Sequence, residues 1–350
     1  MLLVTNDYPP KPGGIQQYLQ NLVAAYPEPI RVLAPADASA DPTETGISRS
    51  KWPFMWPTRR VSEWVINEAR SFQPDAVLFG APHPLPVLTG RLRRSLEVPV
   101  GVLCHGAEVT MPAAFPGSRQ ALAKVLRSAD VLFAVSRFTA GRVEQLTGRS
   151  IQLIGAGVDV ETFRPDGEPG NDVPVVGCVS RFVPRKGQHR LLHAAARLDR
   201  PVAVLLVGKG RNESDLRKLA RDLGIAATFA VDVPWSELPA LYRKMDVFCM
   251  PCRSRWGGLE IEGLGLVYLE AAASGLPVLA GDSGGSPETV RPGETGYVVH
   301  DEDDIVEGLR ILLDDPIRAR FLGAAGRSMV EKNFTWEHVV QRLGEGFRLT

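Results

Sequence analysis

Residues 175–192 read VVGCVSRFVPRKGQHRLL and contain a complete strand–loop–helix unit. The β-branched run at 175–179 predicts a buried strand, a loop with a proline follows it, and a helix is expected to begin near Gly187. Short β-branched runs alternate with helical patterns along the rest of the chain as well. Such alternation favours parallel sheets covered by helices, so we predict an α/β fold.

The strand-like runs form two series, separated by GVDVETFRPDGEPG at 157–170, whose glycine, proline and acidic residues are typical of a linker. The two series predict two Rossmann-like domains that face each other across a cleft. A shared ligand would then lie beyond the carboxyl ends of the strands. The first series comprises 2–5, 30–34, 76–79, 100–104 and 131–135, and the second comprises 175–179, 203–207, 228–230, 247–250, 278–280 and 297–299.

Composition excludes several classes of protein. The 350 residues include 40 basic and 40 acidic side chains, so no nucleic-acid partner is expected. The opening MLLVTNDYPP is apolar only as far as Val4, which is too short for a signal peptide or a membrane span and predicts a first buried strand. Cys249 and Cys252 have the spacing of half a zinc or redox site, but no second pair exists. We interpret them, with Cys104 and Cys178, as buried reduced thiols of a cytoplasmic protein.

Two loops that follow strands are suited to a phosphate ligand. Gly13 and Gly14 begin a predicted helix after the first strand, where glycine lets the backbone approach an anion at the helix N-terminus. A plain tight turn is the alternative. Arg181 and Lys186 flank the loop of the 175–192 unit, and cations beside a helix start suit a diphosphate. Solvated surface cations are the alternative there, and we expect Arg185 to face solvent.

The stretch EIEGLGLVYLE at 260–270 combines a helix start with carboxylates. If 263–265 turn into a helix, Glu262 lies just outside it and Glu270 about one and a half turns inside. Carboxylates repel anionic oxygens but accept hydrogen bonds strongly from hydroxyl groups. A nucleotide-sugar, with a diphosphate between two hydroxyl-bearing rings, suits both the cations and the carboxylates. For Glu270 the alternative is an exposed helix residue.

Taken together, these motifs resemble the retaining glycosyltransferases of family four, which have the two-domain GT-B fold. The family's E-x7-E and R-x4-K motifs, its Gly-Gly loop and its first-domain histidine are matched by Glu262 and Glu270, Arg181 and Lys186, Gly13 and Gly14, and His105. The resemblance covers essentially the whole chain. FTWEHVVQRL at 334–343 resembles the family's C-terminal helix, which crosses back onto the first domain.

The resemblance implies an acceptor domain at 1–160, with a helix at 334–350 packing back on it, and a nucleotide-sugar donor domain at 161–333. Within the family, the motifs most resemble GDP-mannose-dependent phosphatidylinositol mannoside mannosyltransferases. Two departures concern the acceptor. This chain has His-Gly-Ala-Glu at 105–108 where those enzymes commonly have His-Gly-His-Glu, and Trp256 replaces an expected small residue.

The resemblance implies a role for each matched residue. Arg181 and Lys186 bind the diphosphate, and Glu270 binds the ribose hydroxyls. Glu262 binds hydroxyls of the transferred sugar, and His105 lies beside that sugar. The catalytic set is therefore His105, Arg181, Lys186 and Glu262. The donor-binding set is Gly13, Gly14, Arg181, Lys186, Glu262, Gly263, Leu264, Gly265, Leu266 and Glu270.

The two cations and the helix starts compensate the charge of a departing diphosphate, so no metal and no other cofactor is expected. The acidic run 301–303 precedes a helical pattern and is interpreted as favourable helix-start charge. The resemblance implies a retaining reaction, for which we favour a same-face displacement in which the leaving phosphate takes the acceptor proton.

The acceptor remains open between a phosphatidylinositol mannoside-type lipid and a soluble small molecule such as an antibiotic, a cyclitol or a saccharide. The donor is a GDP- or UDP-sugar, with base contacts expected at 231–238, and a sugar-nucleotide epimerase or a non-catalytic binder is the further alternative. Basic and aromatic residues at 49–60, with Arg91, Arg93 and Arg94 nearby, suit a peripheral contact with anionic lipid at the inner face of the cell membrane. A loop packed on the first domain, with solvated charges, is the other interpretation.

Overall fold

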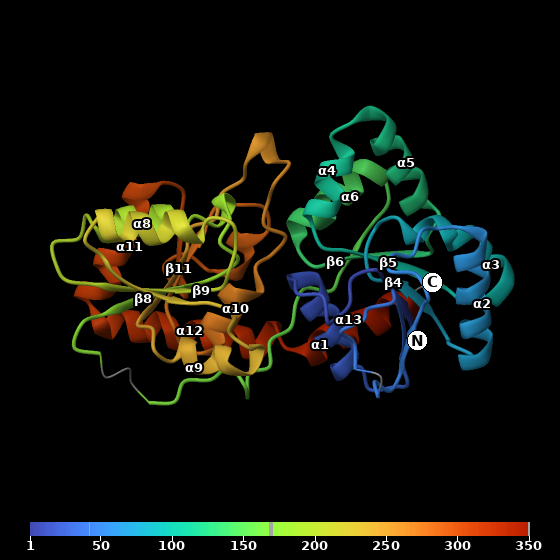
Figure 1. Ribbon diagram of the computed structural model, residues 1–350, viewed down its shortest axis with the longest axis horizontal. Coiled ribbons are helices and arrows are strands. Elements are labelled where there is room, and N and C mark those ends of the chain that lie inside the picture. The colour runs from blue at the N-terminus through green and yellow to red at the C-terminus, as the bar shows by residue number, and fades with distance from the viewer. Residues whose placement is uncertain (42, 168–170, 349–350) are drawn as a thin grey trace. The chain divides into compact units, whose positions relative to one another are not determined.

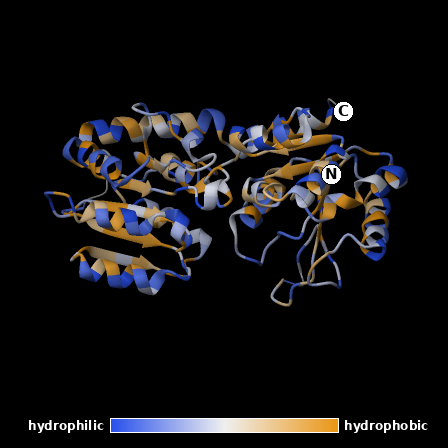
Figure 2. Ribbon diagram, turned by 90° about the horizontal axis from the view of Figure 1, so that it is seen from above, coloured by the Kyte–Doolittle hydropathy of each residue, from blue (hydrophilic) through white to orange (hydrophobic). Residues whose placement is uncertain are grey.

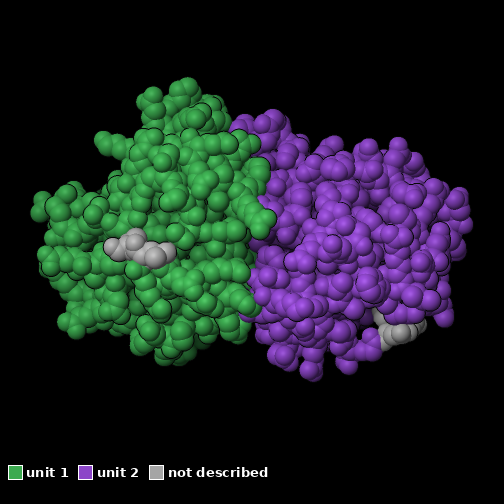
Figure 3. All heavy atoms as spheres, turned by 180° about the vertical axis from the view of Figure 1, so that it is seen from behind, with its two compact units in different colours: residues 1–157, 336–350 green, residues 158–335 purple. Residues whose placement is uncertain are grey.

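The computed structural model describes residues 1–41, 43–167 and 171–348. The chain forms two compact units (Figure 3). Unit 1 comprises Met1–Gly157 and the C-terminal segment from Trp336 onward, and unit 2 comprises Val158–Thr335. Each unit is built on one parallel sheet with helices packed on it, so the predicted α/β fold class is confirmed (Figure 1).

The sheet of unit 1 has seven strands in the order β3-β2-β1-β4-β5-β6-β7, and every neighbouring pair is parallel. Five of these strands were predicted, and the short edge strands β3 and β7 were not. The strand order reverses between β1 and β4, and in such sheets a ligand crevice lies beyond the carboxyl ends of the strands at this point. The strands are β1 Leu2–Val4, β2 Arg31–Ala34, β3 Ile47–Arg49, β4 Val77–Phe79, β5 Val100–Cys104, β6 Val131–Ala134 and β7 Gln152–Leu153.

The helices of unit 1 cover this sheet, and two of those described begin with a side-chain cap. Thr58 accepts a hydrogen bond from the amide of Val61 at the start of α2, and Ser136 accepts one from Thr139 at the start of α6. The helices are α1 Gly14–Ala25, α2 Arg59–Phe72, α3 Thr89–Leu96, α4 Ala107–Ala113, α5 Pro116–Arg127, α6 Arg137–Thr147 and α13 Trp336–Arg348, with a short 3-10 turn at Leu85–Leu88.

The sheet of unit 2 has six parallel strands in the order β10-β9-β8-β11-β12-β13, so the order reverses between β8 and β11. All six were predicted. The strands are β8 Val175–Val179, β9 Ala203–Val207, β10 Ala226–Ala230, β11 Val247–Met250, β12 Val278–Gly281 and β13 Gly296–Val299. The helices are α7 Gln188–Ala195, α8 Glu213–Asp222, α9 Leu238–Tyr242, α10 Leu266–Ala273, α11 Glu302–Asp314 and α12 Pro316–Asn333, and 3-10 turns lie at Pro184–Lys186, Trp235–Glu237, Trp256–Gly258 and Ser286–Thr289.

The central strands are buried along their whole length, as expected when helices cover both faces of a parallel sheet. Every residue of β1, β4, β5 and β11 is buried. Figure 2 shows strands of both sheets mainly in the hydrophobic colour, whereas the helices alternate hydrophobic and hydrophilic residues along their length. The cores therefore hold the strands rigidly and leave the loops at the strand ends free to carry polar side chains.

The C-terminal helix α13 packs against α1, β6 and β7 of unit 1. The ring of Trp336 meets that of Tyr18 edge to face at 5.2 Å between centroids, and Phe347 meets Phe133 at the same separation. A Cβ at Gly157 would lie 2.5 Å from the Trp336 ring, so only glycine permits this approach. The predicted return of the C-terminal helix to the first domain is confirmed.

Three smaller predictions can be compared with the structure. Asp301 caps α11, its side chain accepting from the Asp304 amide at 2.9 Å, which confirms the helix-start interpretation of the acidic run. All four cysteines are buried and free, as predicted. The predicted linker begins at the boundary of the two units, and its residues 168–170 lie outside the described residues.

Among the helices in the described ranges, none has both the length and the apolar content that crossing a membrane requires.

Candidate active site

The loop between β8 and α7 carries the first group of predicted site residues. Arg181 is exposed, whereas the Lys186 side chain is almost completely buried at the end of the 3-10 turn. Gly187 then adopts a left-handed conformation (φ 78°), and a Cβ there would lie 2.2 Å from the carbonyl oxygen of Pro251. Only glycine fits at this position, and it directs Lys186 inward just before α7 begins at Gln188.

The expectation that Arg185 faces solvent is wrong. Its side chain is only 13% exposed, and its guanidinium group donates to the carboxylate of Glu262 and lies 3.9 Å from that of Glu260. The backbone fixes this direction, because the amide of Arg253 donates to the Arg185 carbonyl at 2.9 Å and ties the two loops together. The 3-10 turn carries Arg185 and Lys186 toward the same carboxylate, and Arg181 is the exposed member of the group.

Glu262 is the centre of this arrangement. Its Oε2 atom lies 2.7 Å from Lys186 Nζ and also accepts from Arg185. Among the residues that the structure describes, Oε1 has no hydrogen-bond partner. Burial raises the pKa of Glu262, but the charges of Lys186 and Arg185 outweigh that effect and bring the pKa to about 2. The residue is therefore a charged, compensated carboxylate with one free acceptor atom.

Helix α10 begins at Leu266, and only Gly263, Leu264 and Gly265 separate it from Glu262. Gly265 has a left-handed backbone (φ 91°), and a Cβ there would lie 2.6 Å from the ring of Tyr268. No side chain caps the helix N-terminus, so its first amide groups are available to an anionic or carbonyl oxygen. Along this turn Leu264 is buried and Gly263 and Leu266 are half-buried.

Glu270 lies in the middle of α10 and is half-buried, so the alternative of an exposed helix residue is excluded. The Tyr242 hydroxyl donates to its Oε2 atom at 2.8 Å. Burial raises the pKa of Glu270 to about 7, although the bond from Tyr242 acts in the opposite direction. Tyr242 ends α9, and no motif in the sequence had indicated it.

In unit 1, Gly13 and Gly14 lie where β1 leads into α1. Gly13 has extended backbone, and α1 begins at Gly14 without a side-chain cap. A Cβ at Gly14 would meet no atom within 4 Å, so open space lies beside the backbone there. The position suits close approach of a ligand to the helix start, although packing within the unit does not itself require glycine at Gly14.

His105 follows β5 and is buried. Its Nε2 atom lies 2.9 Å from the Gly80 carbonyl oxygen, and its ring packs edge to face on Tyr18 with centroids 5.2 Å apart. Burial raises the pKa of Asp7, and the proximity of His105 opposes this rise. Glu108 accepts from the amides of His105 and Gly106 and so holds the turn into α4. These contacts give His105 a fixed position at the same sheet edge as the Gly13–Gly14 loop.

Two further segments predicted to contact substrates have clear local structure. Trp256 is 62% exposed on its 3-10 turn, and the Arg255 guanidinium stacks on its ring at 4.9 Å. In the segment 231–238, Trp235 packs edge to face on Phe163. Within the described ranges, no cluster of three or more histidine, cysteine, aspartate or glutamate side chains could hold a metal ion.

Comparisons with known proteins agree with this architecture. Residues 12–162 match the family model described as Glycosyltransferase Family 4, and residues 159–329 match the one described as Glycosyl transferases group 1. A GDP-mannose-dependent monoacylated alpha-(1-6)-phosphatidylinositol monomannoside mannosyltransferase of Corynebacterium glutamicum is 40% identical, with 98% of this chain and 96% of the relative covered. The corresponding alpha-(1-6)-phosphatidylinositol monomannoside enzyme of Mycolicibacterium smegmatis is also 40% identical, with 99% and 97% covered. Among solved structures, a sucrose-phosphate synthase of Thermosynechococcus elongatus has a TM-score of 0.82 at 21% identity, with 99% and 98% covered, which supports the GT-B fold class.

Proposed function

This chain belongs to glycosyltransferase family 4, and from that premise we propose that it transfers mannose from GDP-mannose to a hydroxyl group of a phosphatidylinositol mannoside. The activities for which its relatives are named support this donor and this acceptor. One observation carries the reaction type: the compensated carboxylate of Glu262, with Oε1 free, belongs to the loop that leads into the uncapped start of α10. A hydroxyl-bearing sugar and a diphosphate fit that pair of groups.

The two cations on Glu262 have different roles in this proposal. Lys186 turns from Oε2 toward the incoming diphosphate, while Arg185 stays and keeps the buried carboxylate compensated. An unpaired buried carboxylate would strongly destabilise the protein. Because Arg185 stays paired with Glu262, Lys186 can leave the carboxylate and bind the diphosphate. Arg181, exposed at the end of β8, adds positive charge for the diphosphate, and the amides at the start of α10 add theirs.

For the reaction itself we propose the same-face displacement that the family resemblance implies. The bond between the anomeric carbon and the donor phosphate breaks, and its electron pair goes to the leaving phosphate oxygen. The acceptor hydroxyl attacks on the same face of the sugar and gives its proton to that phosphate, so the configuration is retained. Glu262 holds the hydroxyls of the transferred mannose, Glu270 holds those of the ribose, and His105 lies beside the mannose. Cations and helix amides compensate the leaving charge, so the proposal needs no metal.

A donor and acceptor screen tests the proposal. Thermal shifts with GDP-mannose, UDP-glucose and UDP-N-acetylglucosamine identify the donor, and product detection with lipid and soluble acceptors identifies the acceptor. We expect a stabilising shift with GDP-mannose and an α-linked mannosyl lipid. Transfer to soluble acceptors alone, use of UDP-sugars alone, or a β-linked product would contradict the proposal.

We further propose a peripheral contact with anionic membrane at the inner face of the cell membrane, made by the segment 51–60. Trp56 is 62% exposed and Phe54 is 37% exposed, with their ring centroids 4.8 Å apart, and Lys51 and Arg60 are exposed beside them. Arg49 is not part of this surface, since it pairs with Glu44 at 2.8 Å. Binding to liposomes is expected to require anionic lipid and to weaken with salt. Binding that is insensitive to both would rule the contact out.

A further inference from the structure

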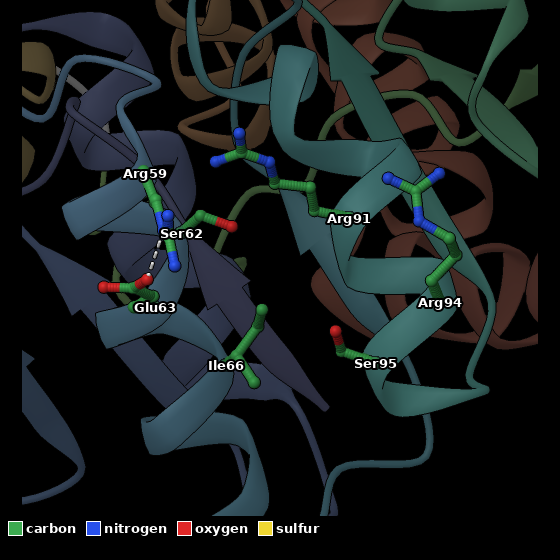
Figure 4. A pocket seen from close by; sticks show the side chains of 7 residues that line it. All are labelled: Arg59, Ser62, Glu63, Ile66, Arg91, Arg94 and Ser95. Atoms are coloured by element: carbon green, nitrogen blue, oxygen red, sulfur yellow. Dashed lines mark hydrogen bonds and ion pairs between the residues drawn. The ribbon is translucent and has the colours of Figure 1, made fainter.

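A pocket of about 290 Å³ lies between α2 and α3 of unit 1, apart from every residue of the donor set (Figure 4). Its polar lining consists of Arg59, Ser62 and Glu63 from α2 and Arg91, Arg94 and Ser95 from α3. The volume is just below the range of about 300–1,000 Å³ that is usual for ligand sites, which suits a compact polar group rather than an extended chain.

The α3 side of the pocket carries uncompensated positive charge. Arg91 and Arg94 are three residues apart, so they share a face of the helix, and in Figure 4 the Arg91 side chain extends toward α2 while that of Arg94 stays on the α3 side of the pocket. Neither has an ion-pair or hydrogen-bond partner among the residues that the structure describes. Arg59 is paired with Glu63 at 2.8 Å, so one arginine of the lining is compensated and two are not.

Ser62 provides an independent indication of a ligand. The residue is 1% exposed, and its hydroxyl has no hydrogen-bond partner in the described part of the chain. A buried helical serine can donate to the carbonyl of an earlier turn, in addition to the ordinary helix bond that this carbonyl accepts, but the Ser62 hydroxyl makes no such bond in the described part of the chain. Figure 4 shows this hydroxyl directed from α2 into the space in front of α3. The Ser62 hydroxyl and the two free guanidinium groups are all hydrogen-bond donors without an acceptor. A ligand with several acceptor oxygens would satisfy all three.

We propose that the α2–α3 pocket is a binding site for a phosphate group, carried either by a small phosphate ester or by a lipid headgroup. Arg91 and Arg94 donate charge-assisted hydrogen bonds to its oxygens, and the Ser62 hydroxyl donates a third. The inference does not rest on the proposed transferase activity, because the pocket shares no residue with the donor set and its occupancy is measured without turnover.

The test uses the full-length protein saturated with GDP, so that any diphosphate-binding groups of unit 2 are occupied. Calorimetry measures the affinity for inorganic phosphate and for glycerol phosphate at constant ionic strength. Flotation measures binding to phosphatidylcholine vesicles with and without phosphatidylinositol. The variants are the double substitution Arg91→Gln, Arg94→Gln and the single substitution Ser62→Ala. The control, Arg70→Gln with Arg119→Gln, removes the same charge from exposed positions of α2 and α5 outside the pocket.

We expect the arginine pair variant to bind phosphate at least about tenfold more weakly than the wild type, and the control to bind as the wild type does. Ser62→Ala should weaken binding without lowering the unfolding midpoint, because its hydroxyl has no protein partner to lose. Binding of soluble phosphate identifies a free ester as the ligand. Binding of phosphatidylinositol vesicles alone, dependent on Arg91 and Arg94, identifies the headgroup. Equal affinity in all variants, an equal loss in the control, or no binding of any probe would overturn the proposal. Failure to bind GDP would count against the proposed donor only.

Discussion

Glu262 and Glu270 lie eight residues apart in sequence, and their environments push their pKa values in opposite directions. Glu262 faces two cations and is charged over the whole neutral and mildly acidic range. Glu270 has only the Tyr242 hydroxyl as a partner, so burial dominates. The first is suited to hold hydroxyls as a permanent anion, and the second changes its charge near neutral pH.

Substitution of Glu262 by glutamine should lower turnover about 10²- to 10³-fold, because the free acceptor atom and the charge that orients Lys186 are both lost. Glu260→Gln is the matched control, since Glu260 also pairs with Arg185, but at 3.9 Å, and is not in the donor set. Initial rates at saturating donor measure the effect. Near-native turnover in Glu262→Gln would remove this residue from the site.

Glu262 should also support acid stability. Its folded pKa of about 2 lies below the ordinary value of 4.5, a difference that corresponds to about 3 kcal/mol. This contribution is fully present above pH 4.5 and is lost as the pH falls toward 2. Urea unfolding across that window should show a shallower loss of stability for Glu262→Gln than for the wild type. Parallel curves would show that the ion pairs do not compensate the carboxylate as described.

For Glu270 we expect the opposite dependence of stability on pH. Its folded pKa of about 7 lies above the ordinary 4.5, so the stability it provides is present below pH 4.5 and is lost as the pH rises through 7. Glu270→Gln should therefore unfold with a higher free energy than the wild type above pH 7, by up to about 3 kcal/mol, while binding the nucleotide-sugar more weakly. The exposed Glu307→Gln on α11 is the control for urea unfolding. A glutamine variant that is less stable than the wild type above pH 7 would contradict this prediction.

At the scale of single elements, the strand–loop–helix units were predictable from sequence, but the directions of loop side chains were not. The period of a strand or helix assigns a face to each residue, and it placed Glu270 inside α10 and Glu262 just before it. A 3-10 turn has no such signal in a polar loop, so Arg185 was misplaced. The edge strands β3 and β7 were missed because they are short and not fully buried, and so lack a continuous apolar run. Tyr242 was missed because its partner is 28 residues away.

The turn into α7 can be tested with two glycines in the same left-handed conformation. Gly187 has φ 78° and a backbone oxygen 2.2 Å from the place of a Cβ, whereas Gly224 has φ 68° and no atom within 4 Å. Alanine at Gly224 should cost about 1–2 kcal/mol of unfolding free energy from the backbone conformation alone. Alanine at Gly187 should cost clearly more, because the loop must move away from Pro251, and it should also weaken donor binding through Lys186. Denaturant unfolding and GDP titration measure both effects, and equal costs at the two sites would show that the clash is relieved.

At the scale of the whole molecule, the last helix belongs to the unit that begins the chain. Trp336 packs against Gly157 and Tyr18, and Phe347 packs against Phe133, so α13 completes the core of unit 1. Trp336→Ala should cost about 3–5 kcal/mol, since the side chain is only 6% exposed and leaves a large cavity. Hydrogen exchange should show a loss of amide protection in α1, β6 and β7, which contact α13, and little change in protection in β8–β13. Trp256→Ala, at a 62% exposed position, is the control and should leave both patterns unchanged. A uniform loss of protection in both units would mean that they unfold as one cooperative body, and that α13 stabilises the chain as a whole rather than unit 1.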